Sequence, residues 1–471
     1  MKKFNICIDK DKKTPIYKQI YECIRIKIDR SEIVENTKLP SIRQLSIKFK
    51  INNLTILKAY NLLESEGYIY KKQGLGAFVK KKDPLLYFNP PKELMESFRN
   101  RESEYTGLID FVSGTPSKDI LPYEEFKEIT KSILEKSGAE ILVYPETQGY
   151  KKLRCFLSNH LREKNINISE KNIQITSGSQ QGLDLMMKTL LSGRNNKIIV
   201  GNPTYHGALN AFRKECNIFG VSLEEDGFNL EELENILSKE NIAFIYTMIN
   251  FQSPTGISWS NKKRKKLIEL AEKYNTYIIE DDCLSDIYFT EKPKVSLKSL
   301  DTENKRVVLI KSYSKVLMPG IRLGYIILPD HLVNKVISAK FTSDISSSGF
   351  EQRILLEFLE GGYFKKHLEK MKTLYRRRYI FLCDILAGID LLKVIYPIEG
   401  GFYIWIELPQ NINSNIFYMK CKEEGISILP GSVFSLGDDH KNNFRLSFAA
   451  ADKKEIIEGL SRMVKIIKNM M

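Results

Sequence analysis

The sequence predicts an α/β fold with a mainly parallel sheet for most of the chain, preceded by a small module of three helices and a β-hairpin. From residue 108 onward, apolar β-branched runs alternate with amphipathic stretches of helical length, which is typical of parallel strands joined by helices. Residues 1–82 contain 19 Lys and Arg residues against 8 Asp and Glu, a net charge of +11 that leaves +3 for residues 83–471. A basic module at one end of the chain favours a polyanionic partner, most simply nucleic acid.

The composition argues against several other classes of protein. At 471 residues, 42% of them hydrophobic, the chain is long enough for two to four domains with sizeable cores. It contains no apolar run of about 18 residues, so we expect no membrane-spanning helix. Its first residues lack the apolar segment of a secretory signal. Its seven cysteines are scattered without metal-ligand spacing, so we expect no metal site and a location in the reducing cytoplasm.

The start of the chain contains helical patterns of apolar residues. Isoleucines recur every four residues between Pro15 and Arg30, which predicts a first helix with the proline in its first turn. Ser41 and Gln44 have the spacing of a capping box, so a second helix is expected to start after Pro40.

A third helix is expected to follow the polar turn at residues 50–53 and to end near Glu66, with Gly67 as its left-handed final residue. Residues 68–70 and 77–79 flank a glycine-rich turn, which predicts a β-hairpin. The third helix carries four leucines: Leu54, Leu57, Leu62 and Leu63. Three short helices and a hairpin with a strong positive charge outline a winged helix-turn-helix domain.

The residues of this module resemble the GntR family of bacterial DNA-binding domains over about residues 12–80. The matching motifs, in order, are Pro15–Ile20, Leu39–Leu45, Thr55–Tyr60, Leu63–Tyr68 and Gly74–Val79. The resemblance implies that the third helix enters the major groove of double-stranded DNA while the hairpin meets the adjacent backbone. Asn53 stands where the family often has an arginine, and Ser31 where it usually has a glycine. The DNA contacts implied are Arg43, Asn53, Thr55, Lys58, Lys71, Lys72, Gly74 and Gly76.

Residues 83–107 predict an interdomain linker. The stretch is charged and polar, and it contains Pro90-Pro91. A short helix is expected in it at most, near Lys92–Arg101.

The remaining residues, 108–471, predict the α/β domain. Helices are expected at residues 181–191 and 262–274, between strands. Because parallel strands bring their carboxyl ends to the same edge of a sheet, ligands are expected to bind at that edge. The strands are expected at residues 173–176, 197–200, 242–246, 276–279 and 306–310.

Polar and reactive side chains follow these strands. The turn Ser177–Gln180 opens a helix and would offer backbone amides to a phosphate, and Arg322 supplies a charge suited to the same group. Asp281 ends a strand where a carboxylate could pair with a protonated ring nitrogen. Lys315 carries an amine able to form a Schiff base, and Tyr205 offers a ring face for stacking. Each of these residues alone is more often a solvated side chain, a helix cap or a connecting turn. Together they describe a site for pyridoxal 5'-phosphate.

This domain resembles the class I/II aminotransferases of fold-type I over about residues 108–471. The resemblance implies a large domain that extends to about residue 340 and a small C-terminal α/β domain over about residues 341–471. It is carried by seven motifs: Gly114-Thr115-Pro116, Tyr144–Gly149, Ser177–Gly182, Gln252–Gly256, Glu280–Asp282, Ser312–Arg322 and Asn443–Phe448.

The resemblance also implies roles for single residues. The catalytic residues would be Lys315, which forms the internal aldimine, Asp281, which pairs with the pyridine nitrogen, and Tyr205, which stacks on the ring. Arg445 would bind the α-carboxylate of an incoming amino acid, with Gly114 beside it. The phosphate would be held by Ser179, Gln180, Ser312 and Arg322, with Tyr144 reaching the phosphate of the partner subunit.

Three positions depart from the family pattern. Ser253 replaces an asparagine that usually contacts the ring hydroxyl of the cofactor, and Cys283 replaces a tyrosine common after the paired acids. Gly201 replaces an acid that often begins the motif ending in Tyr205. The first two changes would thin the hydrogen bonding around the cofactor ring and change the rate of any chemistry there.

A GntR-like module joined to an aminotransferase-like domain resembles the MocR group of bacterial transcriptional regulators. That resemblance implies a head-to-tail homodimer in which each N-terminal module lies over the partner's large domain. Because Lys315 and Arg445 are both retained in a chain with a DNA-binding module, we hypothesise a regulator that senses an effector amino acid or amine by aldimine exchange at Lys315. Two alternatives stay open: an active aminotransferase with an attached DNA-binding module, and a DNA-binding protein whose large domain is only a dimerisation scaffold.

Overall fold

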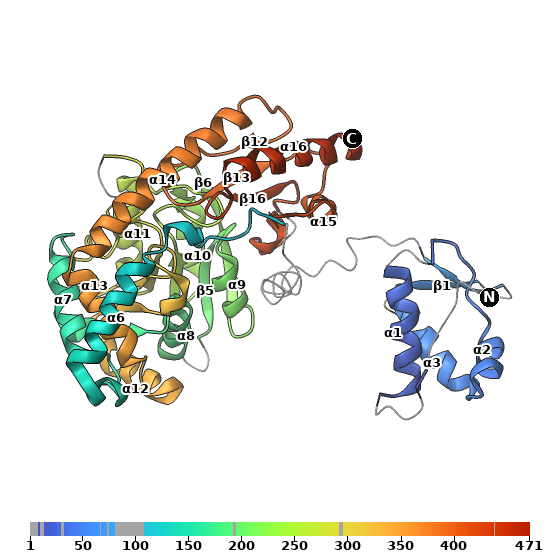
Figure 1. Cartoon of the computed structure of the whole chain (residues 1–471), viewed down its shortest axis with the longest axis horizontal. Helices are drawn as coiled ribbons and strands as arrows, with labels where there is room; N and C mark the ends of the chain where they lie inside the picture. The colour runs from blue at the N-terminus through green and yellow to red at the C-terminus, as the bar shows by residue number, and fades with distance from the viewer. Residues whose placement is uncertain are drawn as a thin grey trace. The chain divides into compact units, whose positions relative to one another are not determined.

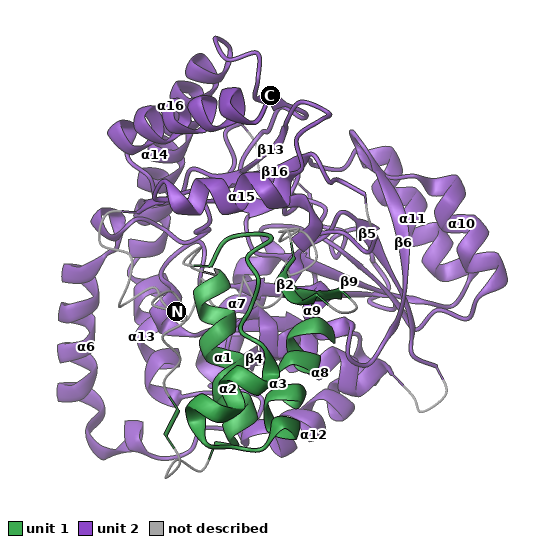
Figure 2. Cartoon of the chain, turned by 90° about the vertical axis from the view of Figure 1, so that its right-hand side faces the viewer, with its two compact units in different colours: residues 1–89 green, residues 90–471 purple. Residues whose placement is uncertain are grey.

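The computed structural model contains two compact units, residues 1–89 and 90–471 (Figure 1; Figure 2). The predicted linker at residues 83–107, with its short helix near Lys92–Arg101, lies outside the residues that the structure describes, as do Ser31 and Gly74. The described residues are 8–9, 14–29, 33–65, 67–72, 75–80, 108–191, 195–291, 295–437 and 439–471.

The small unit has three helices and a hairpin in the predicted order. Its capping box is confirmed, because Ser41 Oγ accepts a 3.2 Å bond from the Gln44 N–H while Gln44 Oε1 accepts a 2.8 Å bond from the Ser41 N–H. Gly67 follows the third helix with a φ of 75°, as expected for a left-handed final residue. The elements are α1 (Ile16–Asp29), α2 (Ile42–Phe49), α3 (Asn53–Ser65) and the antiparallel strands β1 (Ile69–Lys72) and β2 (Gly76–Val79).

The four leucines of α3 do not share one face. Leu63 is buried, but Leu54 is 62% exposed. At 100° per residue, nine residues of α-helix place these two leucines on opposite sides of the helix. The side of α3 that packs in the core is instead formed by Ile56, Ala59, Tyr60 and Leu63.

The large unit is built on an eight-stranded sheet with the order β4-β11-β10-β9-β8-β5-β6-β7. The pairs from β10 to β6 are parallel, whereas β11 is antiparallel to both of its neighbours and β7 is antiparallel to β6. The predicted mainly parallel sheet is therefore confirmed. The strands are β4 (Ile173–Thr176), β5 (Lys197–Asn202), β6 (Asn217–Glu224), β7 (Gly227–Phe228), β8 (Phe244–Thr247), β9 (Tyr277–Asp282), β10 (Val307–Ser312) and β11 (Gly324–Ile327).

Helices cover both faces of this sheet. Every residue of β4, β8, β10 and β11 is buried, as expected for strands packed on two sides. One apolar core includes α8, α9 and α12, and the other includes α10 and α11. The helices are α6 (Tyr123–Ser137), α7 (Lys151–Arg162), α8 (Ser179–Leu190), α9 (His206–Phe212), α10 (Leu230–Lys239), α11 (Asn261–Lys273), α12 (Val333–Asp344) and α13 (Gly349–Glu360).

The C-terminal part of the large unit forms a second, antiparallel sheet with the order β12-β13-β16-β15. The short strand β3 (Ile109–Asp110) pairs in parallel with β14 (Ile426–Ser427), so the first described residues of this unit are held by its C-terminal part. The other elements are α14 (Tyr363–Leu386), β12 (Lys393–Val394), β13 (Tyr403–Glu407), α15 (Ser414–Glu423), β15 (Leu429–Pro430), β16 (Asn443–Ser447) and α16 (Lys453–Met470).

Short 3-10 helices connect several of these elements: η2 (Lys118–Ile120), η3 (Gly138–Leu142), η4 (Glu170–Asn172), η5 (Pro319–Ile321), η6 (Asp330–Leu332) and η7 (Gly431–Val433). No helix among the described residues has the length and apolar character needed to cross a membrane. In the same part of the chain, no cluster of three or more His, Cys, Asp or Glu side chains is arranged to hold a metal ion.

Candidate functional site

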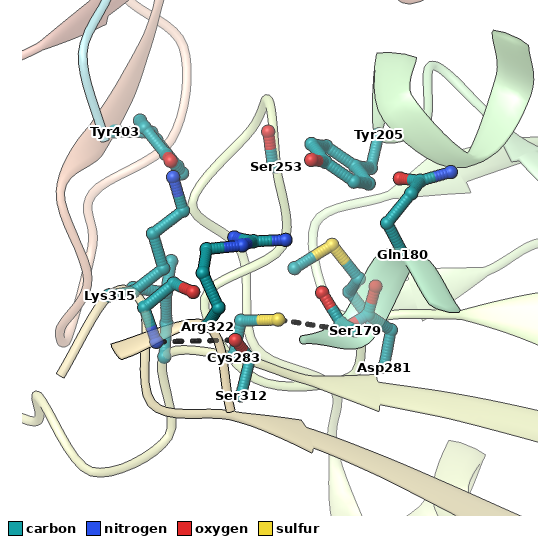
Figure 3. A pocket seen from close by; sticks show the side chains of 13 residues that line it. Ser179, Gln180, Tyr205, Ser253, Asp281, Cys283, Ser312, Lys315, Arg322 and Tyr403 are labelled. Atoms are coloured by element: carbon teal, nitrogen blue, oxygen red, sulfur yellow. Dashed lines mark hydrogen bonds between the residues drawn. The ribbon is translucent and has the colours of Figure 1, made fainter. Parts of the chain in front are cut away.

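Nine of the ten predicted cofactor residues line one pocket of about 150 Å³ (Figure 3). In the view of Figure 3, Tyr205 and Gln180 lie on one side of this pocket, and Lys315 and Tyr403 lie on the other. The predicted residues in the pocket are Ser179, Gln180, Tyr205, Ser253, Asp281, Cys283, Ser312, Lys315 and Arg322. Four further lining residues were not predicted: Met248, Leu284, Ser314 and Tyr403.

One end of the pocket is formed where three strands meet. Gly324 pairs in register with both Thr176 of β4 and Ser312 of β10, which brings the end of β4 beside the end of β10. Helix α8 then starts at Ser179. The residue before it, Gly178, has no side chain that could cap the N–H groups of the first turn. Backbone N–H groups at a helix start bind anions well, because they carry the positive end of the helix dipole.

Arg322 lies at the same end. Its backbone is left-handed, with a φ of 51°. Its guanidinium donates to the carbonyl of Ser177 at 3.1 Å. A Cβ on Gly178 would lie 3.3 Å from Arg322 Nη2, so the glycine lets the guanidinium approach the turn closely. Hydroxyls, helix N–H groups and a guanidinium at one end suit a phosphate.

A buried lysine supports this end from behind. Lys340 of α12 is 0% exposed. Its Nζ donates to Gln181 Oε1 at 2.8 Å, to Ser347 Oγ at 2.9 Å and to the carboxylate of Asp344 at 2.6 Å. Gln181 Oε1 also accepts from the N–H of Ser177, so the network reaches the first residue of the turn. Nothing in the sequence pattern marked Lys340.

Asp281 lies at another side of the pocket and is 1% exposed. Its Oδ2 accepts a 2.9 Å hydrogen bond from the hydroxyl of Tyr246, and its Oδ1 accepts a 2.8 Å bond from the thiol of Cys283. Burial raises the pKa of Asp281 above its ordinary value, while the two donors oppose that rise. Burial and the neighbouring carboxylate raise the pKa of the Cys283 thiol well above its ordinary value, so the thiol stays protonated.

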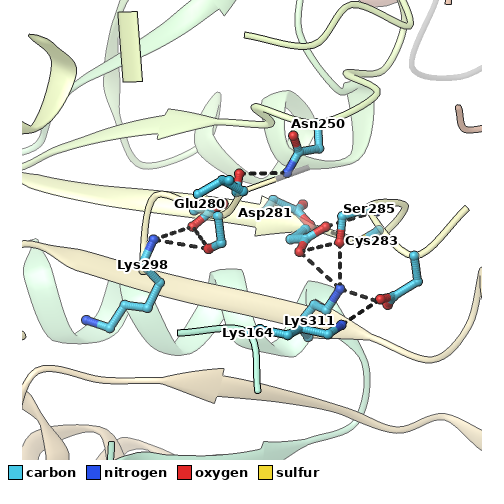
Figure 4. Close-up of polar contacts among 12 residues, drawn as sticks. Lys164, Asn250, Glu280, Asp281, Cys283, Ser285, Lys298 and Lys311 are labelled. Atoms are coloured by element: carbon cyan, nitrogen blue, oxygen red, sulfur yellow. Dashed lines mark hydrogen bonds and ion pairs between the residues drawn. The ribbon is translucent and has the colours of Figure 1, made fainter. Parts of the chain in front are cut away.

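Only one residue of the acidic triplet that ends β9 lines this pocket. The carboxylate of Glu280 accepts from Ser296 Oγ at 2.7 Å and from two backbone N–H groups (Figure 4). Asp282 pairs with Lys311 at 3.0 Å. Because side chains alternate along a strand, Glu280 and Asp282 lie on the face opposite Asp281. Burial and Asp282 raise the pKa of Glu280 to about 7.

Arg445 lies beside the pocket without lining it, and it is 2% exposed. Its guanidinium donates to Ser253 Oγ at 3.2 Å and to the carbonyl of Val112 at 2.6 Å. The centroid of the Tyr403 ring lies 4.1 Å from Arg445 Cζ. Ser253, at the position where the family resemblance implies an asparagine, is therefore hydrogen-bonded to the predicted carboxylate-binding arginine.

Two further predicted residues, Tyr144 and Gly114, also do not line the pocket. Tyr144 is 79% exposed and lines a separate groove with Tyr150 and Arg353. Gly114 lies against Tyr403: a Cβ on this glycine would be only 1.8 Å from the tyrosine hydroxyl. The space that a side chain would need there is filled by Tyr403.

The predicted DNA contacts differ in how free their side chains are. Asn53 and Lys58 are exposed on α3, and Arg43 is exposed on α2, while Thr55 is half-buried. Lys71 donates to Asn61 Oδ1 at 2.7 Å and pairs with Glu64 at 2.5 Å. The ammonium of Lys72 lies over the rings of Tyr70 and Phe78. Gly76 has a φ of 106°, which favours glycine in the turn of the hairpin.

Two families match this chain. The family described as Aminotransferase class I and II matches residues 106–463, and the family described as Bacterial regulatory proteins, gntR family, matches residues 16–79. The Uncharacterized HTH-type transcriptional regulator YdfD of Bacillus subtilis is 29% identical, and the match covers 98% of this chain and 98% of the relative.

The large unit is also similar to enzymes. Aromatic-amino-acid aminotransferase 1 of Thermococcus litoralis is 34% identical over 78% of this chain and 90% of its own length. LysN, an α-aminoadipate aminotransferase of Thermus thermophilus solved in complex with N-(5'-phosphopyridoxyl)-L-leucine, has a TM-score of 0.73 at 29% identity, covering 82% of this chain and 95% of that chain. The chain therefore belongs to the aminotransferase class I and II family and, with its GntR-family domain, is a MocR-type DNA-binding transcriptional regulator.

Proposed function

We propose that this regulator holds pyridoxal phosphate in the pocket beside Lys315, binds an amine or amino acid there as its effector, and changes its DNA affinity in response. The observation that carries the proposal is Asp281, a buried carboxylate in the wall of the pocket that Lys315 and Arg322 also line. A carboxylate, an amine and a guanidinium in one pocket suit three parts of this cofactor: the ring nitrogen, the aldehyde and the phosphate.

The residues present fit the cofactor at each end. The residues that would hold the phosphate lie where the start of α8 meets the end of β10. They are Ser179, Gln180, Ser312 and Arg322. The Asp281 carboxylate accepts one hydrogen bond on each oxygen, from Tyr246 and from Cys283. Because a carboxylate can accept about four hydrogen bonds, it would accept a third from a protonated ring nitrogen. Tyr205, half-buried at the start of α9, would offer its ring face to the cofactor.

When bound, pyridoxal phosphate supplies an electrophilic aldehyde carbon and an electron-withdrawing ring. Lys315 would supply an amine to this carbon, and an incoming primary amine would compete for the same position. Asp281 would hold a proton on the ring nitrogen of the cofactor. Arg445 would pair with a carboxylate on the effector. The residues of the pocket thus provide recognition of a primary amine and, beside it, of a carboxylate.

The small unit provides the DNA-binding part of the proposal. It carries most of the net positive charge of the chain, and the exposed side chains of Asn53 and Lys58 lie on α3, the helix implied to enter the major groove. Arg43 adds an exposed charge on α2. A DNA partner also supports the predicted cytoplasmic location.

We also propose a homodimer. Three consecutive residues after α6, Leu142, Val143 and Tyr144, are 81%, 66% and 79% exposed. Contiguous exposed apolar side chains mark surfaces that a partner covers. A second copy of the chain covering this segment would let Tyr144 reach the partner's phosphate site, as the family resemblance implies. The head-to-tail arrangement stays a prediction.

A second candidate function, an active aminotransferase, is favoured by Arg445. A buried guanidinium beside the pocket suits an α-amino acid, the amino donor of transamination. Formation of a keto acid by the purified protein, in many turnovers per chain, would favour this candidate over an effector sensor.

Cofactor uptake tests the proposal directly. The purified chain is expected to take up pyridoxal phosphate and to show the absorption band of a cofactor bound through a lysine. Lys315→Ala should remove this band while its DNA binding stays measurable, because Lys315 belongs to the large unit. If Lys315→Ala takes up the cofactor and shows the same absorption band as the unmodified chain, the proposal is contradicted.

A further inference from the structure

We propose that Tyr403 is the specificity-determining residue of the effector site: its ring covers Arg445, and an effector carboxylate reaches the guanidinium only after the ring turns aside. The inference rests on the proposed function, because it concerns how the same pocket distinguishes amino acids from plain amines. It also makes a prediction about the protein without any cofactor.

The order of side chains from the pocket outward carries this inference. Tyr403 lines the pocket together with Lys315, whereas Arg445 does not line it and is 2% exposed. The ring of Tyr403 lies over the guanidinium, with 4.1 Å between its centroid and Arg445 Cζ. A ligand in the pocket therefore meets Tyr403 before it can meet Arg445.

The backbone around Tyr403 is built to hold its ring in this place. Tyr403 is the first residue of β13 and pairs in register with Ser447 of β16, while Trp405 pairs with Arg445 itself. Gly114 faces the hydroxyl of Tyr403, and a Cβ there would lie 1.8 Å from that oxygen. The missing side chain of Gly114 makes room for the tyrosine. A role in receiving Tyr403 explains this glycine without any contact to substrate.

The contacts of Arg445 show what an effector would have to replace. Ser253 Oγ and the carbonyl of Val112 accept hydrogen bonds from its two terminal nitrogens, and the Tyr403 ring lies against its face. A cation against an aromatic face is stabilised, and more so away from water. An amino acid must displace this ring contact to place its carboxylate on Arg445, whereas an amine without a carboxylate leaves the ring in place.

The test compares two ligands that differ only in the carboxylate, L-alanine and ethylamine. Each is titrated into the cofactor-loaded protein and followed by the absorption of the bound cofactor. Tyr403→Ala should tighten the apparent binding of L-alanine about tenfold, the equivalent of ~1.4 kcal/mol, with ethylamine unchanged. Tyr403→Phe, which keeps the ring, should behave as the unmodified chain does. Weaker binding of L-alanine in Tyr403→Ala, or an equal change for both ligands, would overturn the inference.

Phe434 offers a matched control. The centroid of its ring lies 5.3 Å from Arg445 Cζ, but Phe434 does not line the pocket. Phe434→Leu should therefore leave the preference between L-alanine and ethylamine unchanged. If it changes that preference as Tyr403→Ala does, the effect comes from the general packing of Arg445 and the inference is wrong.

A second measurement needs neither cofactor nor effector. Butanedione modifies accessible arginines, and mass spectrometry locates the modified residue. Tyr403→Ala should speed modification of Arg445 severalfold, while Arg264, which is 1% exposed elsewhere in the large unit, stays protected. An unchanged rate at Arg445 would overturn the role of Tyr403 even if the protein binds pyridoxal phosphate. If the protein does not bind pyridoxal phosphate but Tyr403→Ala still speeds modification of Arg445, the proposed function alone is overturned.

Discussion

The thiol of Cys283 donates a 2.8 Å hydrogen bond to Oδ1 of Asp281, and both side chains line the same pocket. The hydroxyl of Tyr246 donates to the other oxygen of the carboxylate. Cys283, at the position where the family resemblance implies a tyrosine, therefore still supplies a donor to the pocket. The exchange changes the donor from a phenol to a smaller thiol and leaves Asp281 with a partner on each oxygen.

The pairing predicts how Cys283 reacts. Because a nearby carboxylate disfavours the thiolate, Asp281→Asn should lower the pKa of Cys283 and speed its alkylation severalfold. Iodoacetamide labelling at pH 8 with mass spectrometry measures this rate. Cys383, which lies on α14, should react at the same rate in both proteins. Equal labelling of Cys283 before and after the substitution would show that Asp281 does not control the thiol.

Lys340 is predicted to hold the phosphate end of the pocket. Lys340→Met leaves Asp344 and Gln181 without their shared donor. Breaking a buried ion pair costs ~3–5 kcal/mol, but a third of the Asp344 side chain is exposed, so we expect about 2 kcal/mol of lost stability. The affinity for pyridoxal phosphate should fall severalfold as well.

Thermal unfolding and cofactor titration check this prediction. Lys188→Met is the matched control, because Lys188 donates to Ser343 of the same helix α12 from an exposed position. It should change stability by less than about 0.5 kcal/mol. Equal losses in the two variants would rule out a special role for the buried network.

His367 predicts a pH dependence of stability. It is 4% exposed on α14, and burial lowers its pKa to about 4. Between about pH 6.5 and 4 the unfolded chain binds a proton at this residue and the folded chain does not, so stability falls as pH falls. The loss should reach at most ~3 kcal/mol near pH 4.

His367→Leu should remove this share of the pH dependence. The measurement is the free energy of unfolding by urea at several pH values, for the unmodified chain and the variant. The two curves should run parallel above pH 7 and separate below pH 6. Parallel curves over the whole range would mean that His367 titrates normally in the folded protein.

Two lysines of the small unit should contribute unequally to DNA binding. Lys58 is exposed on α3, whereas Lys71 is engaged by Glu64 and Asn61. Lys58→Ala should weaken binding and reduce the slope of log affinity against log salt by about 1, the value of one lost phosphate contact. Lys71→Ala should change the DNA affinity and its salt dependence much less. Binding assays at several salt concentrations, with an operator selected from random DNA, distinguish the two. A larger effect at Lys71 would mean that this lysine leaves Glu64 to contact DNA.

Local patterns predicted most of the fold. The capping box at Ser41 and the strand runs follow from short-range spacing, and the structure contains each of them. The leucines of α3 did not show which side of the helix is buried, because leucine content alone does not give the phase of a helix. The antiparallel strand β11 was missed, because its direction depends on partners distant in the sequence.

In the pocket too, some residues could be predicted from local patterns and others depend on partners distant in the sequence. Asp281 lies at the end of β9 and Lys315 follows β10, so their shared edge could be inferred from topology. Tyr246, Tyr403 and Lys340 could not, because each reaches the site across the sheet or from another part of the chain. Their roles depend on tertiary contacts that no motif in the sequence marks.

The central claim is that an amine bound at Lys315 changes DNA binding. The most direct test measures the affinity of the cofactor-loaded protein for a selected operator while a panel of amines and amino acids is added. At least one ligand should change the affinity of the unmodified chain, and the same ligand should have no effect on Lys315→Ala. An equal change in both proteins, or no change with any ligand that alters the absorption of the cofactor, would contradict the account.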